Sequence, residues 1–134
     1  MFDESIIGED LIYPDDDGFS SVRCKIRLPW YRGLPVSCVR DIDVTIDGTV
    51  LDRNDLYLTL HGIDHSLDEA LRLDKVFWFV RYVADLHFRT PKPLNPGPHD
   101  LNVVMHLSIP YVREMPFLQV AECKKRVTLV SRDL

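Results

Sequence analysis

The sequence lacks the short motifs that identify several large classes of enzyme. It contains no G-x-S-x-G nucleophile elbow, no glycine-rich phosphate-binding loop and no H-E-x-x-H zinc motif. His61 and His65 are four residues apart, which would place both on one face of a helix and offer a metal pair. Gly62 and the strand-like run before it argue against a helix there, so two loop histidines are the simpler interpretation.

The remaining histidines do not complete a catalytic set. His99 and His106 are seven residues apart on one predicted strand, and this odd offset points them to opposite faces. His87 follows Asp85 by two residues, so the carboxylate would orient the imidazole. A surface contact of small value is the alternative, because the sequence places no serine or cysteine nearby. The residues therefore give no support to a self-contained nucleophilic or metal-dependent enzyme.

Cysteine is scarce, and long apolar runs are absent. The three cysteines, Cys24, Cys38 and Cys123, are an odd number without C-x-x-C spacing. No apolar run approaches 18 residues, and the first ten residues resemble neither part of a signal peptide. These observations predict a protein without membrane spans in a reduced, cytoplasmic setting. Cys24 and Cys38 fall on apolar faces, so we expect them to be small core side chains.

The sequence also lacks a surplus of basic residues. Its 16 Lys and Arg are outnumbered by 21 Asp and Glu, which gives a net charge of −5. Nucleic acids and anionic membranes are bound through basic residues, so neither is predicted as a partner. Asp15, Asp16 and Asp17 supply part of the acid in one run. We expect this run to be a solvated loop, because the ligand spacing of a calcium loop is absent.

What the sequence does contain is the alternating pattern of half-buried strands. Asp47-Gly48 lies between two such runs and predicts a tight hairpin, with residues 49–51 as the returning arm. The pattern predicts strands at Ser20 to Leu28, Val36 to Asp47, Leu56 to His61 and His99 to Ile109. A buried strand is expected at Val76 to Val80, where every residue is apolar, and further strands are expected at Leu86 to Arg89 and Lys124 to Val130.

Helical signals are few. Ser66 and Glu69 have capping-box spacing and predict a short helix that ends near Leu73. Residues 75–89 are ambiguous, because a 15-residue helix competes with two strands separated by a bend near Ala84-Asp85. Their β-branched and aromatic content favours the strands. Three prolines within residues 90–97 exclude both helix and strand there.

These elements predict an all-β fold. The length of 134 residues fits a single domain over residues 1–134. We expect residues 1–19 to form an N-terminal arm or an edge strand, and residues 113–134 to hold a C-terminal strand. About seven short strands, one short helix and no βαβ alternation predict an antiparallel β-sandwich or a partly open barrel.

One loop is unusual for its combination of residue types. Residues 28–39, LPWYRGLPVSCV, lie between two predicted strands. Turn formation explains the prolines and Gly33, but it does not explain why Trp30, Tyr31 and Arg32 occur together. These three residue types dominate binding hot spots, so we interpret the loop as a recognition loop. The alternative is that the aromatic side chains fold back over the core while Arg32 is solvated.

Together with three later segments, this loop resembles a known family. The segments are DIDVTIDG (residues 41–48), VFWFV (76–80) and PLNPGPHDLNVVMHLSIPY (93–111). In this order and spacing, over about residues 20–112, they are similar to the small beta subunit of bacterial C-glycoside deglycosidases. The chain departs from the family pattern at Val80-Arg81-Tyr82-Val83, where a Trp-Phe segment is followed by an aspartate-proline turn in that pattern.

The resemblance implies a subunit of a carbon–carbon lyase that is inactive alone. Its expected partner is a TIM-barrel alpha subunit that carries the general base and a divalent metal, Mn²⁺, so no catalytic or metal-binding residue is expected in this chain. The substrate class would be 3-oxo-C-glycosides, such as those of flavonoids. From the resemblance we expect Trp30, Tyr31, Arg32 and Gly33, with Pro110 and Tyr111, to form an edge near the partner or the substrate.

Two other functional classes remain open from the sequence. A stand-alone carbohydrate-binding β-sandwich would hold sugars on its aromatic residues without catalysis, and it would bind them as a monomer. A structural subunit of an unrelated complex is the third interpretation. A deglycosidase subunit differs from both, because it gains activity only with its alpha partner.

Overall fold

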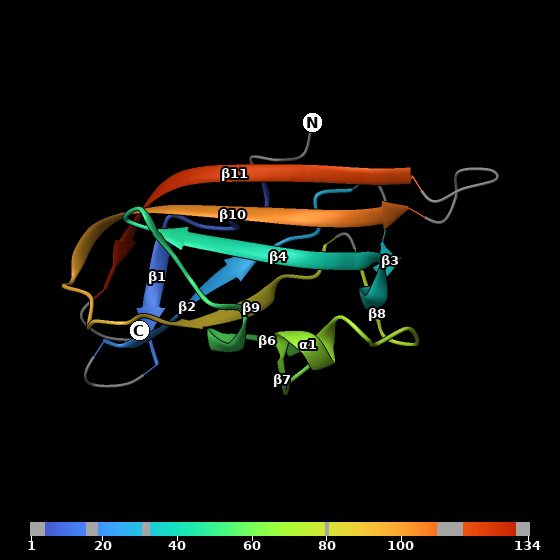
Figure 1. Ribbon diagram of the computed structural model, residues 1–134, viewed down its shortest axis with the longest axis horizontal. Coiled ribbons are helices and arrows are strands. Elements are labelled where there is room, and N and C mark those ends of the chain that lie inside the picture. Colours follow the sequence, from blue (N-terminus) through green and yellow to red (C-terminus); the bar gives the residue numbers. More distant parts are fainter. Residues whose placement is uncertain (1–4, 16–18, 31–32, 80, 110–116, 131–134) are drawn as a thin grey trace.

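Strands dominate the fold. The computed structural model describes residues 5–15, 19–30, 33–79, 81–109 and 117–130 (Figure 1). The strands are β1 (Leu11–Pro14), β2 (Ser21–Ile26), β3 (Leu34–Pro35), β4 (Val39–Ile46), β5 (Thr49–Val50), β6 (Leu56–Leu60), β7 (Ile63–Ser66), β8 (Phe77–Trp78), β9 (Ala84–Arg89), β10 (Gly97–Ile109) and β11 (Phe117–Leu129). The helical elements that lie wholly within the described residues are α1 (Leu67–Ala70) and the 3₁₀ turns Val36–Cys38 and Arg53–Asp55.

Nine of these strands form one curled sheet. Their order is β5-β4-β10-β11-β1-β2-β9-β6-β7, while β3 and β8 form a separate two-stranded sheet. The neighbours pair antiparallel, except for β1 and β11, which run parallel. In Figure 1, β4, β10 and β11 form an upper layer over β2, β9 and β6, and β1 crosses between the layers. The predicted all-β, partly open barrel is therefore confirmed.

The N-terminal segment occupies a different place from the predicted arm or edge strand. β1 lies inside the sheet, where Leu11 pairs with Thr128 of β11 and Tyr13 pairs with Arg23 of β2. The side chain of Ile12 is fully buried. This part of the prediction is wrong, because pairing partners so distant in the sequence leave no local signal at residues 11–14.

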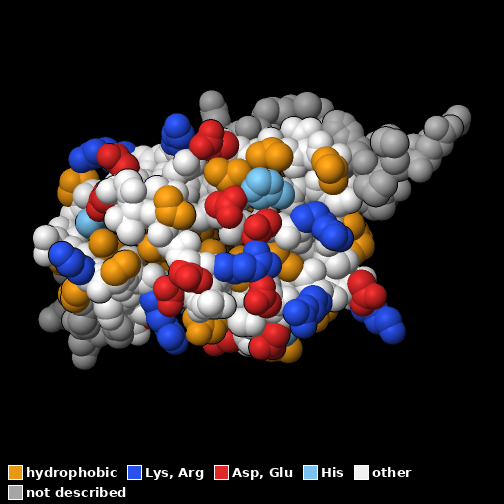
Figure 2. All heavy atoms as spheres, viewed as in Figure 1, with side chains coloured by type: hydrophobic (Ala, Val, Ile, Leu, Met, Phe, Trp, Pro, Cys, Tyr) orange, Lys and Arg blue, Asp and Glu red, His pale blue; other side chains and the backbone are white. Residues whose placement is uncertain are grey.

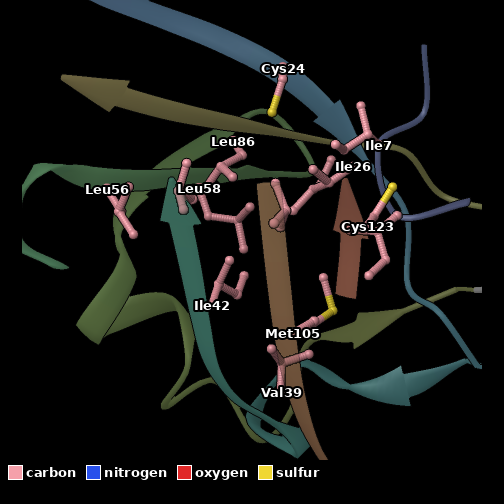
Figure 3. Close-up of a cluster of buried hydrophobic side chains, with 14 of the residues drawn as sticks. Ile7, Cys24, Ile26, Val39, Ile42, Leu56, Leu58, Leu86, Met105 and Cys123 are labelled. Atoms are coloured by element: carbon pink, nitrogen blue, oxygen red, sulfur yellow. The ribbon is translucent and has the colours of Figure 1, made fainter. Parts of the chain in front are cut away.

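The space between the two layers holds the hydrophobic core. Figure 3 shows side chains from β2, β4, β6, β9, β10 and β11 pointing into this space. Cys24 and Cys123 are buried there, whereas Cys38 is only half-buried. Burial raises the pKa of the Cys24 thiol to about 12, so this thiol stays protonated and acts as a small apolar side chain. The prediction for Cys24 is confirmed; Cys38 lies nearer the surface than expected.

Local sequence signals explain the turns and the helix. Asp47 and Gly48 have φ values of 49° and 82°, as a type I′ hairpin turn requires, and the predicted hairpin joins β4 to β5. A second hairpin of this kind, not predicted, joins β6 to β7 through His61 and Gly62. Ser66 accepts a hydrogen bond from the Glu69 amide at the start of α1, which confirms Ser66 as the N-cap, and its hydroxyl donates to the Glu69 carboxylate.

Two longer stretches also follow the expected pattern. The strand interpretation of residues 75–89 is confirmed by β8 and β9, although the bend precedes Ala84 rather than following it. The C-terminal strand β11 begins earlier than the predicted Lys124 and pairs with β10 along thirteen residues. Within the described residues, no helix has the length and hydropathy needed to cross a membrane.

Candidate functional site

The structure describes two of the six predicted edge residues. Trp30 is half-buried and packs against the core, as the alternative interpretation of the loop expected for an aromatic residue. Gly33 is buried. Tyr31, Arg32, Pro110 and Tyr111 lie outside the described residues. The site is therefore built from the two ends of the loop and from the elements that these ends contact.

The returning end of the loop is fixed against β8. Leu34 pairs with Trp78, and Pro35 pairs with Phe77. A Cβ atom on Gly33 would lie 2.3 Å from Cε2 of Phe77 and 2.7 Å from the backbone oxygen of Trp78. No real side chain tolerates such approaches, so this close contact between the loop and β8 requires glycine. The structure thus joins two of the segments that carried the family resemblance.

β8 and the residue after it display two exposed aromatic side chains on either side of a buried one. Trp78 is fully buried, whereas the flanking residues Phe77 and Phe79 are 37% and 58% exposed. The centroids of the two phenylalanine rings are 5.0 Å apart, within the range of favourable aromatic pairs. Exposed phenylalanines this close together form an apolar surface of the kind found at binding sites.

His61 and Tyr82 support this pair from behind. The Trp78 Nε1–H donates a hydrogen bond to the Tyr82 carbonyl oxygen at 3.0 Å, and the Tyr82 amide donates to the Phe79 carbonyl at 2.9 Å. The His61 ring stacks on Tyr82 at 4.5 Å and bonds the Phe77 carbonyl oxygen through Nε2 at 3.2 Å. We call these five residues the aromatic platform: His61, Phe77, Trp78, Phe79 and Tyr82.

The end of β10 lies on the same side of the molecule as the platform. Leu107 of β10 pairs with Val39, the first residue of β4, which follows β3 and the 3₁₀ turn. β10 ends at Ile109, directly before Pro110 and Tyr111 in the sequence. Figure 1 shows β3, β8 and this end of β10 together at the right of the view. The fold therefore brings the flanks of the predicted edge together.

Sequence reasoning missed the platform. The run VFWFV was interpreted as a buried strand because all of its residues are apolar. The strand period places Trp78 inward and its two neighbours outward, and three consecutive aromatic residues cannot all be buried on one face. This alternation was the signal that identifies Phe77 and Phe79 as surface residues.

His61 and His65 lie in different surroundings. His61 belongs to the platform, and His65 lies in β7, where it pairs with Leu58 of β6. No group of three or more potential metal ligands occurs within the described part of the chain. Of the predicted acidic run, Asp15 binds Arg23 at 3.2 Å, and Asp16 and Asp17 lie outside the described residues.

His87 binds a different aspartate from the one predicted. Its Nδ1 lies 2.8 Å from Asp15, and its Nε2 lies 2.8 Å from the Thr59 hydroxyl, while Asp85 pairs with Lys25. Thr59 donates its own proton to Asp64 at 2.5 Å, so it must accept a hydrogen bond from His87. The Asp15 contact raises the pKa of His87 despite partial burial. Both ring nitrogens therefore face hydrogen-bond acceptors, an arrangement that favours the protonated imidazole and disfavours its use as a base.

His99, near the start of β10, is held between two hydrogen-bond acceptors in the same way as His87. It is 8% exposed, with Nδ1 2.5 Å from Asp47 and Nε2 2.6 Å from the Asn95 carbonyl oxygen. Burial is the largest single influence and lowers the pKa of His99, but the hydrogen bonds to Asp47 and Asn95 and the Asp47 charge together raise it above the ordinary value. His106 lies on the outer face, 2.8 Å from Asp43, which confirms that His99 and His106 point to opposite faces.

Comparison with known proteins identifies relatives along most of the chain. A family model described as C-glycoside deglycosidase beta subunit matches residues 11–111. A Microbacterium protein named 3'-dehydrocarminate deglycosidase beta subunit is 39% identical over 114 residues, which cover 84% of this chain and 82% of the relative. A C-glycoside deglycosidase beta subunit of Arthrobacter globiformis is 31% identical over 72% of each chain.

The region of similarity contains the elements described above. It runs from β1 to just beyond the end of β10, and it includes β3, β8 and the whole platform. The name beta subunit implies a complex with another subunit. The chain belongs to the C-glycoside deglycosidase beta subunit family.

Proposed function

We propose that this chain is an accessory subunit of a heteromeric C-glycoside deglycosidase, whose base and metal lie on a TIM-barrel alpha subunit. The observation that carries the accessory role is the state of His87 and His99. Each imidazole is held between two acceptors, which favours its protonated form and disfavours its use as the base that such a reaction needs. Both histidines stabilise the fold instead.

The proposed reaction requires an oxidised sugar. A C–C glycosidic bond has no leaving oxygen to protonate, so the two-carboxylate route of ordinary glycosidases does not apply. A ketone at C3 acidifies the C2 proton, which the base removes. The C1–aglycone bond then breaks, its electron pair leaves with the aglycone carbon, and that carbon takes up a proton. The other product is an unsaturated keto-sugar.

Two features support this substrate class and this division of labour. The name of the Microbacterium relative specifies a 3'-dehydro compound, which agrees with a 3-oxo-C-glycoside substrate. A divalent metal such as Mn²⁺ on the alpha subunit would supply Lewis-acid stabilisation of the negative charge that develops on the C3 oxygen. We expect the complex to be cytoplasmic, which agrees with the absence of a disulfide among the three described cysteines.

The predicted edge keeps its place in this proposal. Tyr31, Arg32, Pro110 and Tyr111 continue from described residues at the platform end, so with Trp30 they would face the partner or the substrate. Arg32 would pair with a carboxylate of the partner, and Tyr31 would stack on an aromatic aglycone. Gly33 would serve this edge indirectly, by allowing the loop to approach β8.

A carbohydrate-binding module is the second candidate, because the outer face of β2, β6 and β9 carries a polar hollow. It measures about 330 Å³ and is lined by Asp15, Ser21, Tyr57, Asp64, His87 and Arg89. Carboxylates and hydroxyls of this kind bind sugars. However, Arg89 lies 4.9 Å from the centre of the Tyr57 ring and covers the surface on which a sugar would stack.

An assay with purified components separates the two candidates. The chain is used as bait in its native lysate, and a captured protein of TIM-barrel size is identified by mass and purified. We expect no turnover of a 3-oxo-C-glycoside by the chain alone, and release of the aglycone once both subunits are mixed. Turnover by the isolated chain would contradict the accessory role. Sugar binding by a monomer that captures no such partner would favour the module.

A further inference from the structure

We propose that the aromatic platform is the surface on which the larger deglycosidase subunit docks, with Phe77 and Phe79 as its central contacts. This inference rests on the proposed function, because it assumes that a larger subunit exists. It goes beyond that function in naming the docking residues, which lie outside the edge predicted from the sequence. Three properties of the platform lead to it: exposure, rigidity and charge.

Exposure and rigidity favour a preformed binding surface. Phe79 is more than half exposed, although an isolated domain would gain free energy by burying it. Hydrogen bonds from Trp78 and Tyr82 fix the backbone behind the ring pair, and the β3–β8 pairing fixes its other side. A surface that is already ordered loses little conformational entropy on binding, which increases affinity.

The charges around the platform differ in sign from the chain as a whole. Arg72, Lys75 and Arg81 are exposed close to the two phenylalanines in the sequence, with Asp74 as the only acidic residue between positions 72 and 82. No ion pair within the described residues involves Lys75 or Arg81. The two phenylalanines therefore lie in sequence beside Lys75 and Arg81, which form no ion pair within the described residues, on a chain of net charge −5.

This charge pattern selects the occupant. A second copy of the chain, docked platform to platform, would bring the same cations together and would be repelled. A partner with an apolar pocket rimmed by Asp or Glu would be attracted, and its carboxylates would neutralise Lys75 and Arg81. The larger subunit is the partner that the family name implies, so we assign it this complementary surface.

A second exposed apolar region provides a matched control. Leu118 and Val120 on β11 are 73% and 55% exposed. Figure 2 shows hydrophobic side chains over β10 and β11, interspersed with acidic and basic ones. His106 pairs across the strands with Val120, and the only apolar outward residue beside them on β10 is Val104. This region is a regular sheet face without side-chain hydrogen bonds that brace its apolar residues.

The test measures the affinity of the purified larger subunit for variants of this chain. The double variant Phe77→Ala/Phe79→Ala removes the central contacts, and Leu118→Ala/Val120→Ala removes the same kind of surface elsewhere. Because all four side chains are exposed to solvent, circular dichroism and thermal unfolding should show both variants folded. We expect the platform variant to raise the Kd by about 30-fold or more, and the control to change the Kd less than about fivefold.

Charge reversal provides a second measurement that does not depend on packing. Arg81→Glu should slow association about tenfold at low ionic strength and less at high salt, because the attraction is screened. The matched control is Arg126→Glu on β11, whose native side chain already pairs with Asp100. A larger effect of Arg126→Glu than of Arg81→Glu would contradict the assignment of the basic rim.

Each remaining outcome is decisive. If the platform variant binds as tightly as the unmodified chain, or if the β11 control loses affinity instead, the docking assignment is overturned while the proposed function stands. If the unmodified chain and the larger subunit do not bind at all, both proposals fail together. If the platform variant instead disrupts self-association of the chain, a second copy is the occupant and our assignment is wrong.

Discussion

The two ends of β10 lie at opposite ends of the molecule and are held by different interactions. At the C-terminal end, ring stacking and hydrogen bonds to backbone carbonyls hold the platform in place. At the N-terminal end, the charged His99 ties the proline-rich connection to the β4–β5 turn through Asn95 and Asp47. We call the contacts of His99 with Asp47 and Asn95 the charged clasp. The comparison shows that an apolar surface lies near one end of β10 and this charged clasp near the other (Figure 1).

The largest expected effect comes from the residue that anchors the platform. Trp78→Ala removes a fully buried indole and its hydrogen bond to Tyr82, so the free energy of unfolding should fall by about 3–5 kcal/mol. Urea unfolding followed by circular dichroism measures this loss. Phe79→Ala is the control, because its exposed ring should contribute less than about 1 kcal/mol. Equal losses for both variants would show that the platform is not built around Trp78.

Gly33→Ala tests the contact between the loop and β8. The added methyl group would overlap the Phe77 ring and the Trp78 backbone oxygen, so we expect a loss of about 1–3 kcal/mol. Combining Gly33→Ala with Phe77→Ala should recover part of this loss, because one of the two overlapping groups is removed. A double-mutant cycle by thermal unfolding measures the recovery. No coupling between the two positions would contradict the observed packing.

The charged clasp at the other end predicts a dependence of stability on pH. The pKa of His99 is raised above its ordinary 6.5, so its stabilisation is complete below about pH 6.5 and is lost as the pH rises through the raised value. His99→Gln should cost about 1 kcal/mol near pH 6, since Asp47 is partly exposed, and less at pH 9. Unfolding curves at several pH values test this, with His87→Gln as the comparison, because the pKa of His87 is also raised.

The contact of Asp47 with His99 should also weaken at low pH, where the Asp47 carboxylate becomes protonated. Its pKa is lowered below 3.8, because hydrogen bonds from His99 and the Asp100 amide outweigh the effect of partial burial. Its stabilisation is present above about pH 3.8 and is lost as the pH falls further. Asp47→Asn should therefore remove part of the loss of stability in acid. A variant as acid-sensitive as the unmodified chain would exclude this role for Asp47.

The smallest effect is expected from an ordinary surface ion pair between the two ends. Lys25 and Asp85 face each other across β2 and β9 at 3.3 Å, and both side chains are partly exposed. Lys25→Gln should change the free energy of unfolding by only about 0.2–1 kcal/mol, with less effect in high salt. A loss as large as that of His99→Gln would show that burial does not distinguish the clasp from a surface contact.

Local patterns in the sequence were enough to predict most of the elements. The alternation in β2, β4, β6 and β10, the Asp47-Gly48 hairpin and the Ser66 cap each depend on neighbouring residues, and each is confirmed. Contacts between distant residues were not predictable in this way. The pairing of β1 with β11 and the Asp15–His87 contact, 72 residues apart, depend on how the whole sheet curls.

The candidate site also combines features that local sequence predicted with contacts between distant residues that it did not. The residue types of the 28–39 loop indicated a recognition surface, and its similarity to a family indicated a partner. The sequence did not reveal that Gly33 would pack against Phe77, because that contact joins segments 44 residues apart and depends on the β3–β8 pairing. The roles of Tyr31, Arg32, Pro110 and Tyr111 stay predictions, since these residues lie outside the described part of the chain.

The position of β1 has a consequence for the order of events during synthesis. Leu11 pairs with Thr128, so the sheet joins residues near the two ends of the chain. β1 can pair with β2 early, but until β11 has been synthesised the other edge of β1 and the facing edge of β10 stay unpaired. Contacts of such sequence separation slow folding, and open edges attract other chains. Synthesis of β11 therefore determines when these two edges become paired and can no longer bind other chains.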